Sequence, residues 1–328
     1  MRSMDLDALA ALAGSFVTTE YASLTRAGAP VTTPVTPYVG ASTLDVSTGL
    51  TYPLKAERAR RDPRVTLAFS DPTGSGIDDA PVVVVKGLAT VRDADLVETS
   101  RRYLRESRAR FPEAFDAIPT PVLARMSWYW ARIWIQVTPV EVLWWRGGDL
   151  GQVPERWRDE TASAPPSDPA PVGRSSGGAA RARKVQQRVD RAVADFPAPV
   201  LTVRDADGWP LPLRCRTARR TASGFVVTPP AGVAVPDGPA NLTFHRHHER
   251  MEHQENLLLV GSASPAGEGS VAFDVERAVG DLSIPKSRLR ASLNLLATGR
   301  ALRPRLEQEA ARRGARVPRF AEVAPPRA

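Results

Sequence analysis

Alternation of apolar and polar positions predicts a chain built mainly from short β-strands. Four stretches alternate in this way and carry β-branched residues: 16–25, 31–39, 43–47 and 65–69. Such a pattern is typical of strands with one buried face. Residues 82–91 open with four consecutive valines, which indicates a strand buried on both faces. Apolar residues at helical spacing predict helices over 5–14 and 95–111.

A short helix is predicted between the strands 43–47 and 65–69. Residues 54–61 are good helix formers, Pro53 suits the first helical position, and Asp62 before Pro63 ends the helix. The side chains around its N-terminus are one lysine and three hydroxyls: Lys55, Ser47, Thr48 and Thr51. Free N–H groups, hydroxyls and a lysine at a helix N-terminus favour a bound phosphate. The alternative is an ordinary crossover helix with a solvated basic face.

The second half of the chain repeats the strand pattern of the first. The stretches that match in order and spacing are 199–203, 211–216, 224–228, 240–245, 257–263 and 271–279. Matching strands in matching order predict two related copies of one unit. Residues 229–239 stand where the lysine-bearing helix would be, and they are rich in Pro and Gly with no basic residue. The second copy therefore lacks the predicted phosphate site.

Composition shifts predict four regions. We expect a cofactor-binding unit over 1–150, a linker rich in Pro, Ser and Gly over 151–182, a degenerate repeat over 183–281, and a helical tail over 282–328. The tail, rich in Leu and Arg, is placed to clamp the two units together.

Charge and cysteine content exclude several classes of protein. The net charge is +8, but only four of the 44 basic residues are lysine, and the arginines are scattered without a nucleic-acid-binding motif. No apolar run approaches the ~20 residues of a membrane helix. The first residues lack a signal-peptide pattern, and the single cysteine, Cys215, cannot form an internal disulfide. We therefore expect a cytoplasmic protein with no nucleic-acid or membrane partner.

Several motifs together resemble a known superfamily. A strand ending in Ser47-Thr48, then Lys55, then Arg60, Arg61, Asp62, Pro63, Arg64 and Val65, is similar to the pyridoxamine 5'-phosphate oxidase-like split β-barrels. Residues 22–35, with a turn at Gly28, resemble the opening hairpin of this superfamily, and 131–139 resemble its closing strand. The resemblance covers about residues 5–147. It implies a mainly β fold with flanking helices: two split β-barrels in one chain, the second degenerate.

The resemblance also implies a cofactor and its site. Members of the superfamily bind FMN or the deazaflavin coenzyme F-420, so the chain is expected to be an oxidoreductase acting on a planar small molecule. The expected cofactor contacts are Thr33, Pro34, Val35, Ser47, Thr48, Thr51, Lys55 and Arg58. No catalytic side chain is named, because the cofactor carries the hydride chemistry. A chain that only sequesters flavin, deazaflavin or haem is the alternative function.

One departure from the superfamily pattern affects the expected site. Many relatives have Arg where this chain has Glu57, which would repel a phosphate, so either Arg58 takes over the contact or the site binds a less anionic group. The substrate candidates are Tyr38, Trp130 and Trp134, although a core role is the default for buried aromatics. Barrels of this superfamily pair, and the pairing here is either within the chain or in a homodimer.

All four histidines fall in one stretch: His245, His247, His248 and His253. On a strand, His245 and His247 face the same side and are spaced to chelate. The stretch lacks a recognised metal motif, and its position corresponds to a solvent-facing loop of the relatives. We therefore predict structural or surface histidines and no metal site, with metal or haem binding as the alternative.

Overall fold

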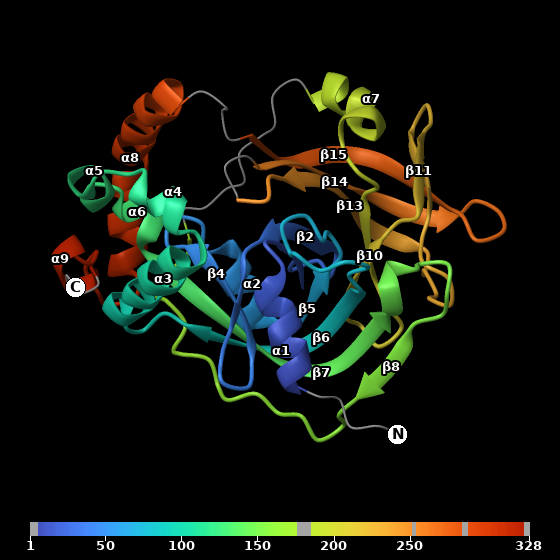
Figure 1. Ribbon diagram of the computed structural model, residues 1–328, viewed down its shortest axis with the longest axis horizontal. Coiled ribbons are helices and arrows are strands. Elements are labelled where there is room, and N and C mark those ends of the chain that lie inside the picture. The colour runs from blue at the N-terminus through green and yellow to red at the C-terminus, as the bar shows by residue number, and fades with distance from the viewer. Residues whose placement is uncertain (1–5, 176–184, 251–253, 284–287, 325–328) are drawn as a thin grey trace.

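Two antiparallel sheets of matching topology make up the protein (Figure 1). The computed structural model describes residues 6–175, 185–250, 254–283 and 288–324. The first sheet has the order β2-β1-β5-β6-β7-β4-β3, with β8 beside β7. Its strands are β1 (Thr19–Leu24), β2 (Pro30–Val35), β3 (Pro37–Val39), β4 (Leu44–Gly49), β5 (Arg64–Phe69), β6 (Val82–Arg92), β7 (Arg132–Trp145) and β8 (Glu155–Arg158).

The second sheet repeats the first strand for strand. Its order is β10-β9-β13-β14-β15-β12-β11. Its strands are β9 (Val200–Arg204), β10 (Pro210–Arg214), β11 (Thr217–Arg220), β12 (Gly224–Thr228), β13 (Gly238–His247), β14 (Gln254–Pro265) and β15 (Val271–Ser283). Adding eight to each label of β1 to β7 reproduces this order. The predicted tandem of two related split-barrel units is confirmed.

A shared β-bulge shows how closely the two copies correspond. The register shifts at Lys86/Gly87 in the first sheet and at Val260/Gly261 in the second. A Cβ atom on either glycine would collide with a carbonyl oxygen of the neighbouring strand, on Thr138 or Asp274 respectively. Only glycine permits this approach of two backbones.

Helices cover the first sheet more fully than the second (Figure 1). The helices of the first half are α1 (Leu6–Ser15), α2 (Leu54–Arg61), α3 (Leu96–Arg110), α4 (Pro112–Asp116), α5 (Thr120–Ala124) and α6 (Ser127–Trp130). The later ones are α7 (Val185–Asp195), α8 (Arg288–Ala311) and α9 (Phe320–Val323). Leu306 and Ala310 of α8 belong to the core of the first half, so the C-terminal helix packs on the first unit. Helix α2, predicted over 54–61, has no counterpart between β12 and β13.

The back face of the first sheet is buried in the core of the second half. That core contains five residues of the first sheet: Ala68, Val82, Val84, Leu143 and Trp145. They pack with apolar residues of the second sheet such as Leu242 and Phe244, which are fully buried. The opposite face of the first sheet forms a separate core with α1, α2 and α3. The two units are therefore joined by a common apolar core within one chain.

Contacts between the sheets follow a pseudo-two-fold pattern. Strand β2 contacts β13, β9 and β14, and its counterpart β10 contacts β5, β1 and β6. Thr32 of β2 makes hydrogen bonds to the second half. Asn241 Oδ1 accepts from the Thr32 N–H at 3.0 Å, and the Thr32 and Thr202 hydroxyls lie 2.6 Å apart. Reciprocal contacts of this kind are those of an isologous dimer interface, here formed between two repeats.

Two segments differ from the sequence-based expectation. The stretch 31–39, predicted as one strand, is divided into β2 and β3, which lie at opposite edges of the first sheet. The prolines Pro34 and Pro37 lack the N–H groups that a continuous central strand would need. In the proline-rich segment, β8 pairs with β7, and the Asp168 carboxylate accepts the N–H groups of Asp93 and Ala94. The predicted region boundaries stay predictions. No helix in the described ranges is long and apolar enough to cross a membrane.

A buried ion pair between the halves gives a stability prediction. Lys86 is buried, with its Nζ 2.9 Å from Glu141 and 2.7 Å from Asp205 of the β9–β10 turn. Lys86→Met removes the buried cation from both carboxylates and leaves Glu141 only the exposed Arg156 at 3.7 Å, so the free energy of unfolding should fall by about 3–5 kcal/mol. Arg146→Met, which breaks the exposed pair with Glu155, is the control and should change little. Urea denaturation of both variants measures this. Equal stabilities for the two variants would contradict a role for Lys86 in joining the halves.

Candidate functional site

Helix α2 begins directly after a turn that the end of β4 holds in place. The Thr48 hydroxyl donates to the Tyr52 carbonyl at 2.8 Å, which fixes this turn. The helix has Pro53 at its N-cap and no side-chain cap. Its first N–H groups therefore have no intrahelical acceptor. The Thr51 hydroxyl oxygen is buried beside them with no hydrogen-bond partner. This end of α2 therefore presents hydrogen-bond donors that have no anionic acceptor among the described residues.

Three basic side chains gather at this end of α2. Lys55 is half-buried, and burial, with Arg58 and Arg132 nearby, lowers its pKa to about 8. Burial also lowers the pKa of Arg58. Among the described residues, no carboxylate lies within ion-pairing distance of Lys55, Arg58 or Arg132. Uncompensated cations in a partly buried place are costly unless an anion joins them.

Arg132 was not among the residues predicted for the site. The register of β4 and β7 places it opposite Gly49, just before the turn to α2. Its guanidinium lies 4.2 Å from the centre of the Tyr103 ring and 5.3 Å from that of Tyr129. One nitrogen donates to the Tyr103 hydroxyl at 2.9 Å, whereas Nε is buried with no partner. The two aromatic rings thus hold the Arg132 guanidinium in place, and its Nε–H is left to donate to a ligand.

Glu57 is neutralised by the C-terminal helix. Its carboxylate lies 2.8 Å from Arg312, the residue directly after α8, and Arg312 also pairs with Glu309 at 2.6 Å. The repulsion expected between Glu57 and a phosphate is therefore offset by an arginine 255 residues away in the sequence. The helical tail, predicted as a clamp, contributes to the electrostatics of α2.

The predicted ring-edge residues lie on β2, beside the basic cluster. Thr33 pairs with Tyr21 across β1 and β2, so the two side chains share one face of the sheet. Arg58 lies near the Tyr21 hydroxyl, and burial raises the pKa of Tyr21 far above its usual value. Pro34 points to the other face and pairs with Glu20. The structure thus brings Thr33 and Arg58 to one side of β1, and ring contacts by Thr33, Pro34 and Val35 stay a prediction.

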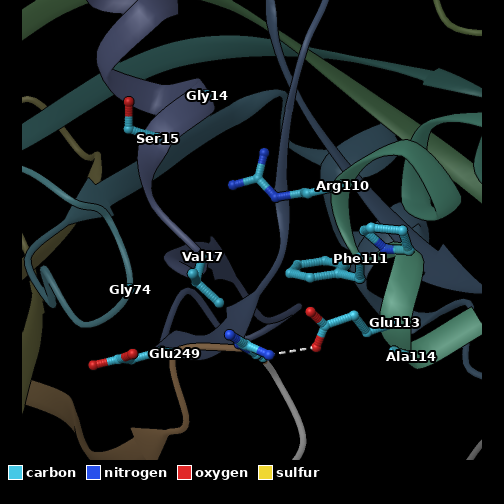
Figure 2. A pocket seen from close by; sticks show the side chains of 11 residues that line it. Gly14, Ser15, Val17, Gly74, Arg110, Phe111, Glu113, Ala114 and Glu249 are labelled. Carbon is cyan, nitrogen blue, oxygen red and sulfur yellow. Dashed lines mark hydrogen bonds and ion pairs between the residues drawn. The ribbon is translucent and has the colours of Figure 1, made fainter.

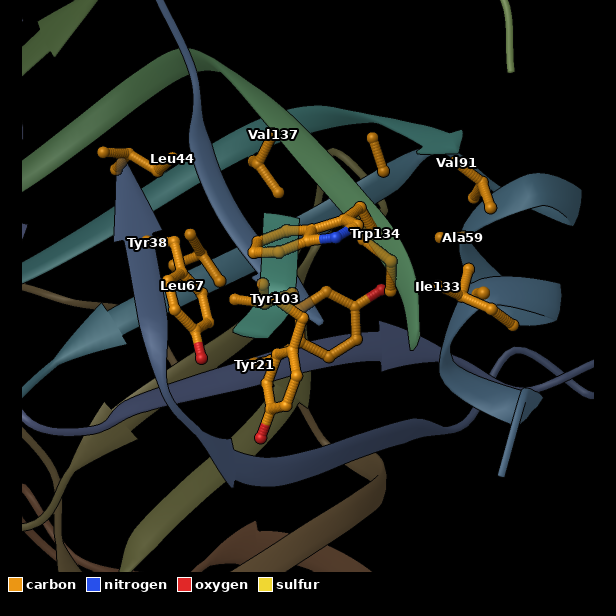
Figure 3. Close-up of a cluster of buried hydrophobic side chains, with 14 of the residues drawn as sticks. Tyr21, Tyr38, Leu44, Ala59, Leu67, Val91, Tyr103, Ile133, Trp134 and Val137 are labelled. Atoms are coloured by element: carbon orange, nitrogen blue, oxygen red, sulfur yellow. The ribbon is translucent and has the colours of Figure 1, made fainter. Parts of the chain in front are cut away.

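The three aromatic residues predicted for substrate binding are all buried (Figure 3). Trp134 packs edge-on against Tyr38 with ring centres 4.9 Å apart, and Arg102 stacks on it at 3.8 Å. The indole of Trp134 donates to the Thr99 carbonyl at 2.8 Å, and that of Trp130 donates to the Leu123 carbonyl at 2.9 Å. Satisfied donors and full burial favour the core role for these rings. A substrate contact by them stays a prediction.

Two cavities lie near the ends of the first sheet. The larger, of about 760 Å³, lies between the α5–α6 segment and α8, and Trp128 lines it together with Arg125, Arg300, Arg303 and Glu307, the last two of which are paired at 2.9 Å. The Trp128 carbonyl and the Arg132 guanidinium both lie close to Gly49. The cleft that Trp128 lines therefore adjoins the basic cluster. The smaller, of about 330 Å³, lies between α1, α4 and the end of β13 (Figure 2). A cleft lined by arginines next to an anion site suits a ligand with more than one negative group.

The histidine stretch differs from the expectation of a surface loop. His245 and His247 are buried between the two halves, where they contact Glu20 and Asp71 of the first half, respectively. His248 is exposed, and His253 lies outside the described residues. The structural role is therefore supported for the first two, and the surface location is wrong for them. Glu20, Asp71 and Arg214 contact this pair, and sequence spacing could not show these contacts because they come from strands far apart in the chain.

Comparison with solved structures gives matches to single-unit proteins. A putative pyridoxamine 5'-phosphate oxidase from Listeria innocua shares 18% identity, with 42% of this chain and 94% of that chain covered and a TM-score of 0.29. The general stress protein 26 from Bacillus anthracis shares 14%, with 47% and 97% covered and a TM-score of 0.32. An F-420 reductase shares 16%, with 40% and 92% covered and a TM-score of 0.30.

No family model matches the chain, and no curated protein does. Each of these three matches covers less than half of this chain and nearly all of the other. The strand order and register of the two sheets, rather than these matches, define the fold.

The uncompensated charge of Lys55 predicts a stabilising substitution. Because the pKa of Lys55 is lowered from its unfolded value to about 8, the charged form destabilises the ligand-free protein below pH 8, and stability recovers as the pH rises from there toward the unfolded pKa. Lys55→Met should therefore raise the free energy of unfolding at pH 7 by about 1–3 kcal/mol, and by less at pH 9.5. Urea denaturation at both pH values tests this. A loss of stability at pH 7 would show that Lys55 is compensated.

Proposed function

We propose that the first unit binds a phosphate-bearing flavin-type cofactor, FMN or F-420, and that the chain is an oxidoreductase acting on a planar small molecule. The observation that carries the proposal is the group of three cations around the start of α2. In the described part of the chain they have no carboxylate partner, and a buried hydroxyl and a buried guanidinium nitrogen beside them lack acceptors. A phosphate would satisfy all of these donors together.

The residues present fit such a group. Lys55, Arg58 and Arg132 would hold the phosphate, with the Thr51 hydroxyl and the N–H groups of α2 as further donors. Residues of β2, Thr33 foremost, would flank the ring. When bound, the cofactor supplies hydride transfer. The contribution of this chain is to bind and orient the cofactor, and the apolar face of the first sheet keeps water from that place.

FMN and F-420 make different demands on the surroundings of the phosphate. FMN ends in a phosphate monoester, whereas F-420 continues beyond its phosphate into a carboxylate-bearing tail. The arginine-lined cleft beside Trp128 would accept such a tail, and this favours F-420. The degenerate second unit favours the alternative function, a protein that sequesters the cofactor without turnover. Reduction of the bound cofactor and its reoxidation by added acceptors distinguish the two.

Removal of any one cation should weaken cofactor binding. Lys55→Met and Arg132→Met should each lower the affinity by about 1.5–3 kcal/mol, which is the usual value of a charge-assisted hydrogen bond. The affinity of the wild type should also fall as the pH rises above 8, because Lys55 loses its proton there, and Lys55→Met should flatten this dependence. Fluorescence titration with FMN and with F-420 measures both effects.

The matched control for these variants is Arg158→Met. Arg158 is exposed on β8, so its loss changes the net charge equally without touching the cluster. If Lys55→Met and Arg132→Met both bind the cofactor with the affinity of the wild type, the phosphate lies elsewhere. If the control weakens binding as much as the others, the effect is long-range charge.

The asymmetry between the units predicts one cofactor per chain. The second unit has a loop in place of α2 and no lysine there, so its equivalent pocket lacks the donors for a phosphate. Isothermal titration calorimetry should give one site per chain. Two equal sites per chain would show that the cations of α2 are not what holds the cofactor.

A further inference from the structure

The two buried histidines face a carboxylate from the other half of the chain. His245 and His247 lie on β13 with their rings parallel, 6.5 Å apart between centres. Asp71 follows β5 in the first half, and its Oδ2 lies 3.4 Å from Nδ1 of His247 and 4.0 Å from Nδ1 of His245. One ligand atom from each residue lies within 4.8 Å of the other two. All three residues are buried.

Hydrogen bonds on the far side of each ring determine which nitrogen carries the proton. Nε2 of His245 lies 2.7 Å from the Glu20 carboxylate, and Nε2 of His247 lies 3.1 Å from the Thr73 carbonyl. The Thr73 carbonyl is an acceptor, so Nε2 of His247 carries the hydrogen and its Nδ1 presents a lone pair, while Nε2 of His245 lies between the Glu20 carboxylate and an Arg214 nitrogen at 3.0 Å. The Thr18 hydroxyl lies 3.3 Å from Nδ1 of His247, while Nδ1 of His245 is buried with no partner.

This arrangement is unfavourable without a cation at its centre. Nδ1 of His245 is buried without a partner beside the Asp71 carboxylate, and a polar atom buried in this way is costly. Two carboxylates, those of Glu20 and Asp71, contact the two imidazoles, and Arg214 contacts Glu20 and His245.

We propose that Asp71, His245 and His247 form a site for one divalent transition-metal ion of the zinc class. Ligand atoms around tetrahedral Zn²⁺ lie about 3.3 Å apart, so the His247–Asp71 distance already fits and the His245 ring needs only a small shift. The Glu20 and Thr73 contacts are the outer hydrogen bonds that orient metal-bound imidazoles. Two imidazoles and a carboxylate select zinc-like ions over Mg²⁺ or Ca²⁺.

Such an ion would connect the two repeats. Asp71, Glu20 and Thr73 belong to the first half, and both histidines belong to the second. Val17 and Gly74, the chain neighbours of Thr18 and Thr73, line the 330 Å³ cavity of Figure 2, which gives an ion a path from solvent. Glu20 and Tyr21 are adjacent on β1 and face opposite sides of the sheet, so this site is separate from the cations at α2. The histidine stretch contains no recognised metal motif, and only the fold brings Asp71 next to it.

Metal titration of the whole chain tests the proposal. Protein purified without an affinity tag and stripped with EDTA should bind one Co²⁺ per chain, with the visible absorption of a low-coordinate site, and Zn²⁺ should displace it. Zn²⁺ should also raise the melting temperature. Asp71→Asn and His247→Gln should abolish the absorption, and Glu20→Gln should weaken Co²⁺ binding by about 10–100-fold. His248→Gln, at the exposed neighbouring histidine, is the matched control and should leave it unchanged.

Several outcomes would overturn the metal site. Wild-type protein that shows neither Co²⁺ absorption nor a Zn²⁺-dependent melting temperature would show that the cluster holds a proton instead. Binding that survives in both ligand variants, or that disappears in His248→Gln, would place the ion at the surface. The wild-type titration is decisive even if a variant fails to fold. Cofactor binding at Lys55 should be the same in His247→Gln as in the wild type, so failure of one proposal does not affect the other.

Discussion

Burial of the back face of the first sheet against the second unit is the constraint on which the rest of the structure depends. Residues such as Val84 and Trp145 are buried in the apolar core that is formed mainly by the second half, so the first unit alone would expose this face of its sheet to water. Homologous strands make reciprocal contacts across a pseudo-two-fold axis, with β2 and β10 nearest to it. A duplicated chain thereby acquires the interface of a dimer without any dependence on protein concentration.

The two units agree in the features that the sheets need and differ in the segment where the phosphate site is proposed. The copies agree in strand order and in the bulge at Gly87 and Gly261, which the sheets need in order to form. They differ in the segment between the fourth and fifth strands, where the first copy has α2 and the second has a loop. The C-terminal helix increases this asymmetry, because Leu306 and Ala310 pack in the first core and Arg312, directly after the helix, pairs with Glu57.

Sequence patterns predicted the local features well and the long-range ones poorly. The helix over 54–61, the repeat and the loss of the helix in the second copy depend on short-range periodicity and turn residues, and all three were predicted correctly. The break at Pro37, which sends β3 to the far edge of the sheet, depends on pairing between distant strands. Arg132, Arg312 and Asp71 were missed for the same reason: each meets its partners through strand register or tertiary packing. Arg132 could have been predicted, because it lies at the start of the stretch that resembles the closing strand of the superfamily.

Alternation along a single strand explains how one sheet can carry two different kinds of chemistry. On β1, Tyr21 faces α2 and the unpaired cations, whereas Glu20 faces the second half and contacts His245 and Arg214. The first face has a surplus of positive charge and the second a surplus of negative charge, with one layer of backbone between them. Each surplus lies where burial makes an uncompensated charge costly. A ligand of opposite charge would remove this cost, and both the cofactor proposed on one face of β1 and the metal ion proposed on the other are such ligands.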